Sequence, residues 1–383
     1  MKLNYFSILA LFTLLAVSVP AQQQDSTHKM DVNAAIYYNK SVEAMKANNL
    51  KDAAVIIDSA LAISHDYRIV FLKGQICFKM SNWDCAAKQF EECITLDKTS
   101  ELAYVQLSAA YNNQKLFDKA IAVNKDLIKI TKDPQKKSEA EARINDLQQP
   151  MAIDYYNQGI DLSKSSKFDE AIAMFNKSLS IKKDPKVYLT KGVTLSKMQK
   201  PAEAIAEIKS AIAIDSTYDL AYYTLGGMYF AAKDYKNALP NYLKAQEITK
   251  IEALKNNSKE SLKAVYFQLG IASYSEKKWD AAIENFTKSN EQVEYDQAYL
   301  WLGKTYTEKK KYDLALQSFD KALLIKKTVT EGAIGYYKGA MYKQKGDLDK
   351  AIEFFKQGLT EDKFKKACKS EIDNITAMKK QKK

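Results

Sequence analysis

The stretch from Ala298 to Ile325 reads AYLWLGKTYTEKKKYDLALQSFDKALLI and decides the fold. Apolar and small residues recur three and four positions apart in two segments, and the charged stretch 308–311 separates them. This spacing places those residues on one face of each of two α-helices. Gly303 and Ala315 allow the two backbones to approach closely, and Phe319 fills the space beside them. The stretch therefore predicts a helical hairpin.

The same pattern recurs along nearly the whole chain. Its glycine, or the residue in the equivalent place, occurs nine times at intervals of 33, 34, 51, 33, 34, 44, 33 and 36 residues, at Ser41, Gly74, Ser108, Gly159, Gly192, Gly226, Gly270, Gly303 and Gly339. An alanine of the second segment is present in all nine units, and the residue four positions after it is large and apolar except at Asn124. The third unit is therefore the least regular.

This order of Tyr, Leu-Gly, Tyr, Ala, Phe and Ala, over a unit of about 34 residues, resembles the tetratricopeptide repeat (TPR) family. The resemblance implies an all-α fold, a right-handed superhelical solenoid of about nine TPR hairpins closed by a C-terminal capping helix. The two long intervals separate three groups of three units. The expected segments are TPR units 1–3 (33–134), an inserted helix (135–151), TPR units 4–6 (152–249), a second insertion (250–262), TPR units 7–9 (263–363), and a capping helix with a basic tail (364–383).

The first 21 residues have the features of a secretory signal peptide. They contain one Lys, a short apolar run from Tyr5 to Val17, and the small residues Val19 and Ala21 at the places that a signal peptidase requires. An uncleaved membrane anchor is the alternative, but the run is shorter than the ~20 residues that span a bilayer. After a polar lead-in over residues 22–32, we expect the mature protein to reside in the periplasm or outer envelope of a bacterium.

The sequence offers little catalytic chemistry. His28 and His65, the two histidines, lie in the lead-in and at the end of the first hairpin, where they share no metal site or nucleophile dyad. Gly303-Lys304-Thr305 looks like the end of a phosphate loop, but Ala298 stands where the upstream glycine is needed. No metal or cofactor is expected. An enzyme with its active site in an insertion is the disfavoured alternative.

The four cysteines are Cys77, Cys85, Cys93 and Cys368. An even count in an exported protein suggests disulfides. Against this, residues eight apart on one helix lie ~12 Å apart along its axis, too far for a bridge. The spacing favours Cys77 and Cys93 as small apolar packing residues.

Positive charge gathers at the C-terminal end. The formal net charge is +11, and residues 363–383 carry eight Lys against Glu371 and Asp373. This tail suits weak contact with an anionic surface, and the alternative is that it only keeps the chain soluble. No nucleic-acid-binding module is recognisable, so nucleic acid is not an expected partner.

The family resemblance also indicates candidate binding residues. In TPR proteins the first helix of each hairpin lines a concave groove, and the residue after the first packing aromatic points into it. Carried over to this chain, that row comprises Tyr38, Phe71, Tyr156, Tyr223, Phe267, Leu300 and Tyr336. The preceding aromatic residues are expected to pack the hairpin, which would leave the row surplus to the core. A second row one turn further on is largely apolar and includes Lys304.

Two interpretations of this row remain open: it binds a ligand, or it packs against the next hairpin. The favoured function is a non-catalytic scaffold of the cell envelope that binds a polypeptide segment in the groove. A structural or adaptor subunit of an envelope secretion or assembly machine is the alternative.

Overall fold

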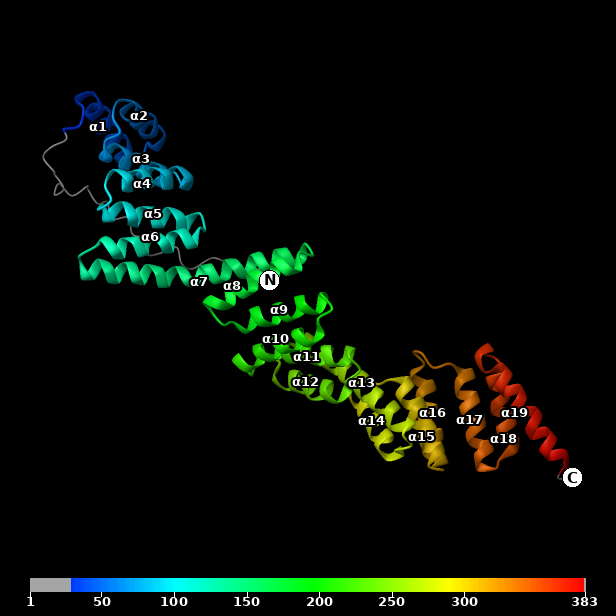
Figure 1. The fold of residues 1–383 in the computed structure, drawn as a ribbon. Coiled ribbons are helices and arrows are strands. Elements are labelled where there is room, and N and C mark those ends of the chain that lie inside the picture. Colours follow the sequence, from blue (N-terminus) through cyan, green and yellow to red (C-terminus); the bar gives the residue numbers. More distant parts are fainter. Residues whose placement is uncertain (1–28, 382–383) are drawn as a thin grey trace. The chain divides into compact units, whose positions relative to one another are not determined.

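Nineteen α-helices follow one another in residues 29–381, the part of the chain that the computed structural model describes (Figure 1). They pack as nine sequential hairpins and a final helix, which confirms the predicted all-α array with its C-terminal cap. The chain divides into two compact units, one ending at Val187 and one beginning at Tyr188. The expected signal peptide and His28 lie outside the described residues.

The first unit holds four hairpins. Its helices are α1 (Val32–Lys46), α2 (Leu50–Ile63), α3 (Tyr67–Lys79), α4 (Trp83–Leu96), α5 (Glu101–Asn113), α6 (Phe117–Ile130), α7 (Pro134–Lys164) and α8 (Phe168–Ile181). The division between the units falls within the next helix. The remaining helices are α9 (Pro185–Lys197), α10 (Pro201–Ile214), α11 (Asp219–Ala231), α12 (Tyr235–Ile248), α13 (Glu252–Ser275), α14 (Trp279–Gln292), α15 (Asp296–Glu308), α16 (Tyr312–Ile325), α17 (Glu331–Lys345), α18 (Leu348–Gly358) and α19 (Asp362–Gln381).

Each hairpin core is built on a close approach of its two helices. In seven hairpins a first-helix glycine lies against the large side chain sixteen residues later, the pairs being Gly74–Phe90, Gly159–Phe175, Gly192–Ile208, Gly226–Tyr242, Gly270–Phe286, Gly303–Phe319 and Gly339–Phe355. A Cβ atom added to Gly74 would come within 2.7 Å of the Phe90 ring. Only glycine leaves room for the ring, so the spacing seen in the sequence is a packing requirement.

The turn inside each hairpin also repeats. Every one of the nine turns contains one residue with a left-handed backbone, at Asn48, Ser81, Lys115, Ser166, Gln199, Lys233, Lys277, Lys310 and Gly346. Glycine accepts this conformation most readily, but only the last turn uses it. The following residue is the N-cap of the second helix. Its side chain caps the helix where it is Asn or Asp, as Asn49 does by accepting from the Asp52 N–H.

The two insertions lengthen first helices. The segment expected as a separate inserted helix, 135–151, is the first half of the 31-residue helix α7, with Pro150 inside it. The second insertion, 250–262, supplies the first turns of the 24-residue helix α13. Leu147 of α7 and Leu262 of α13 are buried in the cores of the hairpins that precede them. Each insertion is therefore packed in place by the preceding hairpin.

Cys77 and Cys85 form a disulfide, which corrects the expectation that they are unpaired. Their Cα atoms are 5.7 Å apart because Cys77 lies in the last turn of α3 and Cys85 in the first turn of α4, and the chain reverses between the two helices. A separation of ~12 Å applies only to residues eight apart on one continuous helix. Cys93 and Cys368 are free and buried, as packing residues.

The described residues contain neither a membrane-spanning helix nor a metal-binding cluster. Within residues 29–381 no helix combines the length and the apolar character needed to cross a membrane. No group of three or more His, Cys, Asp or Glu in the same residues is arranged to hold a metal ion.

Candidate functional site

The structure places the predicted row of first-helix residues in two environments. Phe71 and Leu300 are 2% and 6% exposed, so these two are core residues and the expectation that they face a groove is wrong. Leu300 belongs to a cluster that includes Ile334 of the next hairpin. The other five members, Tyr38, Tyr156, Tyr223, Phe267 and Tyr336, are half-buried.

The row is not surplus to the hairpin core. Five of its rings contact the large second-helix residue nineteen positions later, with centroids 5.4 to 6.1 Å apart, in the pairs Phe71–Phe90, Tyr156–Phe175, Tyr223–Tyr242, Phe267–Phe286 and Tyr336–Phe355. The reason is the spacing: each row residue lies three positions before the glycine and so shares its helix face. A second-helix side chain that packs against the glycine must therefore also contact the row residue.

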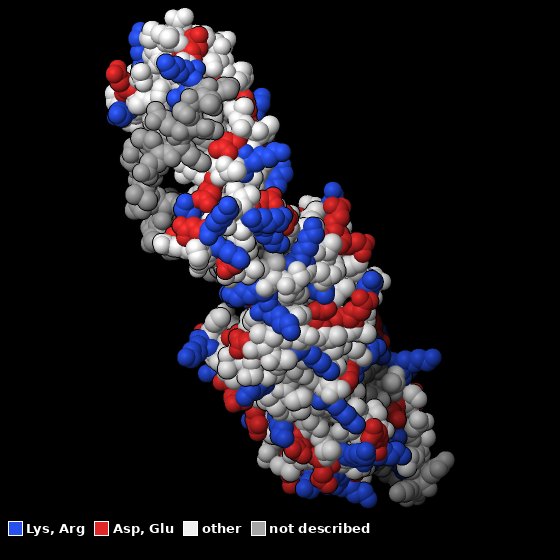
Figure 2. All heavy atoms as spheres, turned by 60° about the vertical axis from the view of Figure 1, so that its left-hand side comes forward, with Lys and Arg blue, Asp and Glu red and all other residues white. Residues whose placement is uncertain are grey.

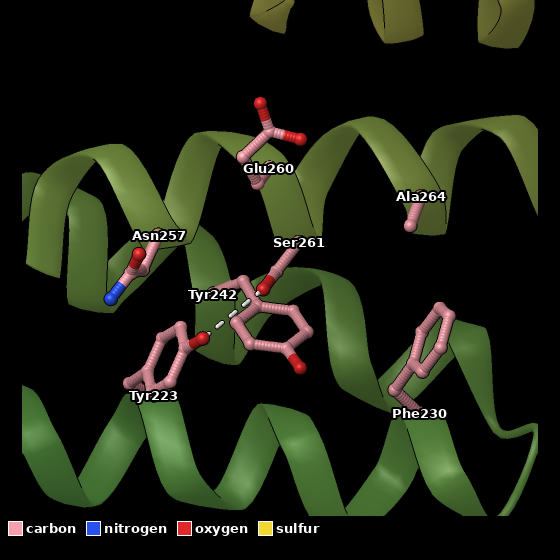
Figure 3. Close-up of a pocket in the computed structure, with 7 residues that line it drawn as sticks. All are labelled: Tyr223, Phe230, Tyr242, Asn257, Glu260, Ser261 and Ala264. Atoms are coloured by element: carbon pink, nitrogen blue, oxygen red, sulfur yellow. Dashed lines mark hydrogen bonds between the residues drawn. The ribbon is translucent and has the colours of Figure 1, made fainter.

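Tyr223 lines a cavity of about 270 Å³ in the second unit (Figure 3). Its walls come from three helices: Tyr223 and Phe230 on α11, Tyr242 on α12, and Asn257, Glu260, Ser261 and Ala264 on α13. Figure 3 shows the rings of Tyr223, Tyr242 and Phe230 around its centre, with α13 on the opposite side. The cavity is therefore mostly aromatic on one side and mostly polar on the other.

The polar groups at this cavity are mainly uncharged. The Ser261 hydroxyl donates a long hydrogen bond of 3.5 Å to the Tyr223 hydroxyl. Burial raises the pKa of Tyr242 despite a hydrogen bond from Ser261, so its phenol stays protonated. Glu260 forms an ion pair with Lys263, and Figure 3 shows its carboxylate directed away from the rings. The site thus offers aromatic faces, hydroxyls and the Asn257 amide.

The second insertion builds half of this cavity. Asn257, Glu260 and Ser261 all lie in the 250–262 segment that extends α13 beyond the ordinary repeat. The sequence indicates the insertion and Tyr223 separately, but it does not indicate Phe230, Tyr242 and the α13 residues as one site. The length of the insertion is the sequence feature that indicates this site, because the added helical turns must pack against a neighbouring hairpin.

A smaller cavity, about 30 Å³, involves Tyr156 in the first unit. It is lined by Gln149, Ala152, Ile153, Tyr156, Ser178, Lys182, Asp184, Lys186 and Val187. Its size suits a water molecule better than a side chain. Tyr223 is therefore a better candidate for a binding residue than Tyr156.

The basic residues do not form one patch on the visible surface. Figure 2 shows Lys and Arg interspersed with Asp and Glu over the face in view. Exposed lysines do follow one another along the capping helix α19, at positions 363, 365, 366, 369 and 380. Contact of this helix with an anionic surface stays a prediction.

Four stretches of the chain match the family model for the tetratricopeptide repeat, residues 185–218, 220–251, 296–328 and 336–364. The chain therefore contains tetratricopeptide repeats within residues 185–364. No curated protein matches the sequence.

Several solved structures are similar to the chain. The P58(IPK) TPR domain is 14% identical, with 92% of this chain and 99% of that one covered and a TM-score of 0.32. YrrB, described as a TPR protein with an unusual peptide-binding site, is 21% identical. The match covers 49% of this chain and 91% of that one, with a TM-score of 0.36. PilF of Pseudomonas aeruginosa is 20% identical, and the match covers 60% of this chain and 99% of that one, with a TM-score of 0.33.

Proposed function

We propose that this protein is a non-catalytic scaffold that binds an extended polypeptide segment across the first helices of its second unit. The cavity beside Tyr223 carries the proposal, because it is a concave site with one aromatic side and a few convergent hydrogen-bonding groups. Its volume of about 270 Å³ lies below the range of about 300–1,000 Å³ typical of small-molecule sites. One large side chain of a bound segment suits it better than a cofactor.

The composition of the cavity indicates the kind of side chain. Aromatic faces favour another ring through offset or edge contacts. The Ser261 and Tyr223 hydroxyls and the Asn257 amide can hydrogen-bond the polar edge of a Tyr or Trp side chain. We therefore expect bound segments to carry an aromatic residue with a hydrogen-bonding group.

We also propose that the scaffold works outside the cytoplasm, in the cell envelope. The Cys77–Cys85 disulfide supports this location, because disulfides persist in oxidising compartments such as the bacterial periplasm. The signal-like residues 1–21 support it independently. N-terminal sequencing of protein from the periplasmic fraction should start near Gln22, whereas an intact Met1 on membrane-bound protein would contradict export.

A displayed random-peptide library selected on the full mature chain tests the binding function. Asn257→Trp fills the cavity from α13 without altering a ring contact, and Asn256→Trp makes the same change on the neighbouring residue, which is exposed and does not line the cavity. Enriched peptides should bind the Asn256→Trp variant normally and the Asn257→Trp variant at least about tenfold more weakly. Equal binding by both variants would exclude the cavity as the site, and no enrichment at all would exclude peptide binding.

A further inference from the structure

Lys304 on α15 differs from three other lysines whose side chains are largely covered. Lys73, Lys191 and Lys338 have side chains 11–14% exposed, and their ammonium groups form ion pairs with Asp58, Glu207 and Asp320 at 2.5 to 2.7 Å. Lys304 is half-buried, yet within residues 29–381 no carboxylate forms an ion pair with it. Burial of a cation without a counter-charge costs free energy, so this exception requires an explanation.

Three aromatic rings surround the ammonium group instead. Its Nζ atom lies 3.4 Å from the ring centroid of Trp301, 4.9 Å from Tyr337 and 5.5 Å from Tyr274. These rings stand on α13, α15 and α17, the first helices of three consecutive hairpins. We call Tyr274, Trp301 and Tyr337 the aromatic box.

The aromatic box is fixed by its own contacts. Tyr274 meets Trp301 edge to face at 5.0 Å and Trp279 at 5.1 Å. Trp301 stacks on the buried Phe286 at 6.0 Å, and Tyr337 contacts Tyr336 at 5.2 Å. The Lys304 ammonium is therefore presented from a preformed position rather than from a freely moving side chain.

The box satisfies the charge of Lys304 only in part. A ring face attracts a cation through its quadrupole, but it is a poor substitute for the oxygen acceptors that three N–H donors require. Burial lowers the pKa of Lys304 to about 8, and the negative charge of Glu308 opposes this effect without overcoming it. A carboxylate brought to the ammonium group would supply both the missing acceptor and the missing counter-charge.

We propose that the ammonium group of Lys304, held by the aromatic box, is the anchor for an internal Asp or Glu side chain of the bound polypeptide segment. This inference rests on the proposed peptide-binding function and names a second feature of the ligand. The box supplies apolar faces for the rest of the segment, which favours a polypeptide over a free inorganic anion. The formal net charge of +11 also attracts acidic partners during encounter.

The anchor can be tested with the same displayed peptide library, selected on four full-length mature proteins: wild type, Lys304→Gln, Lys304→Arg and Lys310→Gln. Lys310→Gln is the matched control, because it removes the same charge from an exposed turn where Gln199 occupies the equivalent left-handed position. Asp and Glu should be enriched on wild type, Lys304→Arg and Lys310→Gln, and the enrichment should disappear on Lys304→Gln.

A double-mutant cycle then measures the contact itself. One enriched synthetic peptide and its Glu→Gln version are bound to wild type and to Lys304→Gln. The peptide change should weaken binding to wild type at least about tenfold and leave binding to Lys304→Gln nearly unchanged. An equal loss on both proteins would overturn the anchor while leaving peptide binding intact. Absence of any enriched peptide on wild type would overturn both.

Protection from chemical labelling tests the anchor on the wild-type protein alone, so the result does not depend on whether a variant folds. Trace acetylation of wild type with acetic anhydride, followed by peptide mapping, reports the reactivity of each lysine. The enriched peptide should lower the labelling of Lys304 and leave that of Lys310 unchanged. Unchanged labelling of Lys304 at saturating peptide would overturn the anchor.

Discussion

The side-chain amide of Asn124 donates a hydrogen bond to the hydroxyl of Ser108 at 2.5 Å, at the place where seven other hairpins set a glycine against a large side chain. Asn124 is fully buried and also donates to the Ala120 carbonyl at 2.9 Å. Its amide oxygen accepts from the Arg143 guanidinium at 3.1 Å. Arg143 belongs to the first insertion, so the polar residue of the irregular third unit is hydrogen-bonded by the inserted turns of α7.

This pairing predicts that Asn124 and Ser108 can only be exchanged together. Asn124→Phe alone sets a ring against the Ser108 side chain and should lower the free energy of unfolding by about 1–3 kcal/mol. Adding Ser108→Gly recreates the glycine-and-ring pair of the other hairpins and should recover most of that loss. Urea unfolding of the two single variants and the double variant measures the coupling. A double variant no more stable than Asn124→Phe would contradict the prediction.

Two glycines of the second unit should respond oppositely to alanine. A Cβ on Gly270 would lie 2.5 Å from the buried Phe286 ring, so Gly270→Ala should destabilise by about 1–3 kcal/mol. A Cβ on Gly227 would find its nearest neighbour, the Tyr242 hydroxyl, at 3.5 Å. Gly227→Ala should therefore stabilise α11 by about 0.5–1 kcal/mol through helix propensity. Thermal unfolding checks both signs, and a similar loss for both variants would disprove the packing argument.

Asp296 should make the α16–α17 loop sensitive to acid. Its buried carboxylate accepts hydrogen bonds from the Thr328 and Val329 N–H groups and from the Thr328 hydroxyl. Burial raises the pKa of Asp296, but these hydrogen bonds outweigh burial and hold the pKa below its usual value. A depressed folded-state pKa adds stability above the unfolded value of about 3.9, and this stability is lost as the pH falls through the folded value.

The corresponding experiment is hydrogen exchange at pH 6 on wild type and Asp296→Asn. The Thr328 and Val329 amides should exchange faster in the variant, and the free energy of unfolding should fall by about 1–3 kcal/mol, as for hydrogen bonds to a charged group. The difference in unfolding free energy between the two proteins should shrink below about pH 4. Unchanged exchange at both amides would show that the carboxylate does not hold the loop.

Thiol counting should reveal one disulfide and two inaccessible cysteines. Cys93 and Cys368 are fully buried, and burial raises the pKa of Cys93 to about 12. The folded, oxidised protein should therefore show no reactive thiol, the unfolded protein two, and the unfolded, reduced protein four. Four thiols in unfolded protein isolated without reductant would show that Cys77 and Cys85 are not paired. Reduction should lower stability by roughly 2–3 kcal/mol.

The helices and their pairing follow directly from sequence periodicity, because glycine, alanine and ring positions recur at spacings that only two close-packed helices explain. The disulfide did not follow, since the eight residues from Cys77 to Cys85 cross a turn whose left-handed residue, Ser81, has no distinctive residue type. A comparison of adjacent residues alone does not give the direction of the aromatic row. Its three-residue offset from the glycine would have placed it on the hairpin core.

The candidate site was accessible to sequence reasoning only in part. The repeat position indicates Tyr223, and the 44-residue interval indicates the 250–262 insertion. Their meeting in one cavity depends on how α13 packs on α11 and α12, which no local pattern encodes. The repeat pattern places Lys304 at a groove position, but its aromatic box joins residues from three hairpins.

The last prediction concerns pH. If Lys304 anchors an acidic side chain, binding requires its protonated form, whose free-state pKa is about 8. The surrounding titratable groups do not compete: burial raises the pKa values of Tyr274 and Tyr337, which keeps both phenols neutral, and Glu308 is exposed. Affinity for an enriched acidic peptide should therefore be nearly constant below about pH 7.5 and fall toward tenfold per pH unit above pH 8.

Isothermal titration at pH 6.5, 7.5, 8.5 and 9.5 measures this dependence, with the Glu→Gln peptide as control. The control peptide should bind with little change over the same range, because it needs no charge on Lys304. The Lys304→Arg variant should bind the acidic peptide throughout, since a guanidinium stays protonated. A parallel decline for the acidic and neutral peptides would assign the pH effect to another group and remove Lys304 as the anchor.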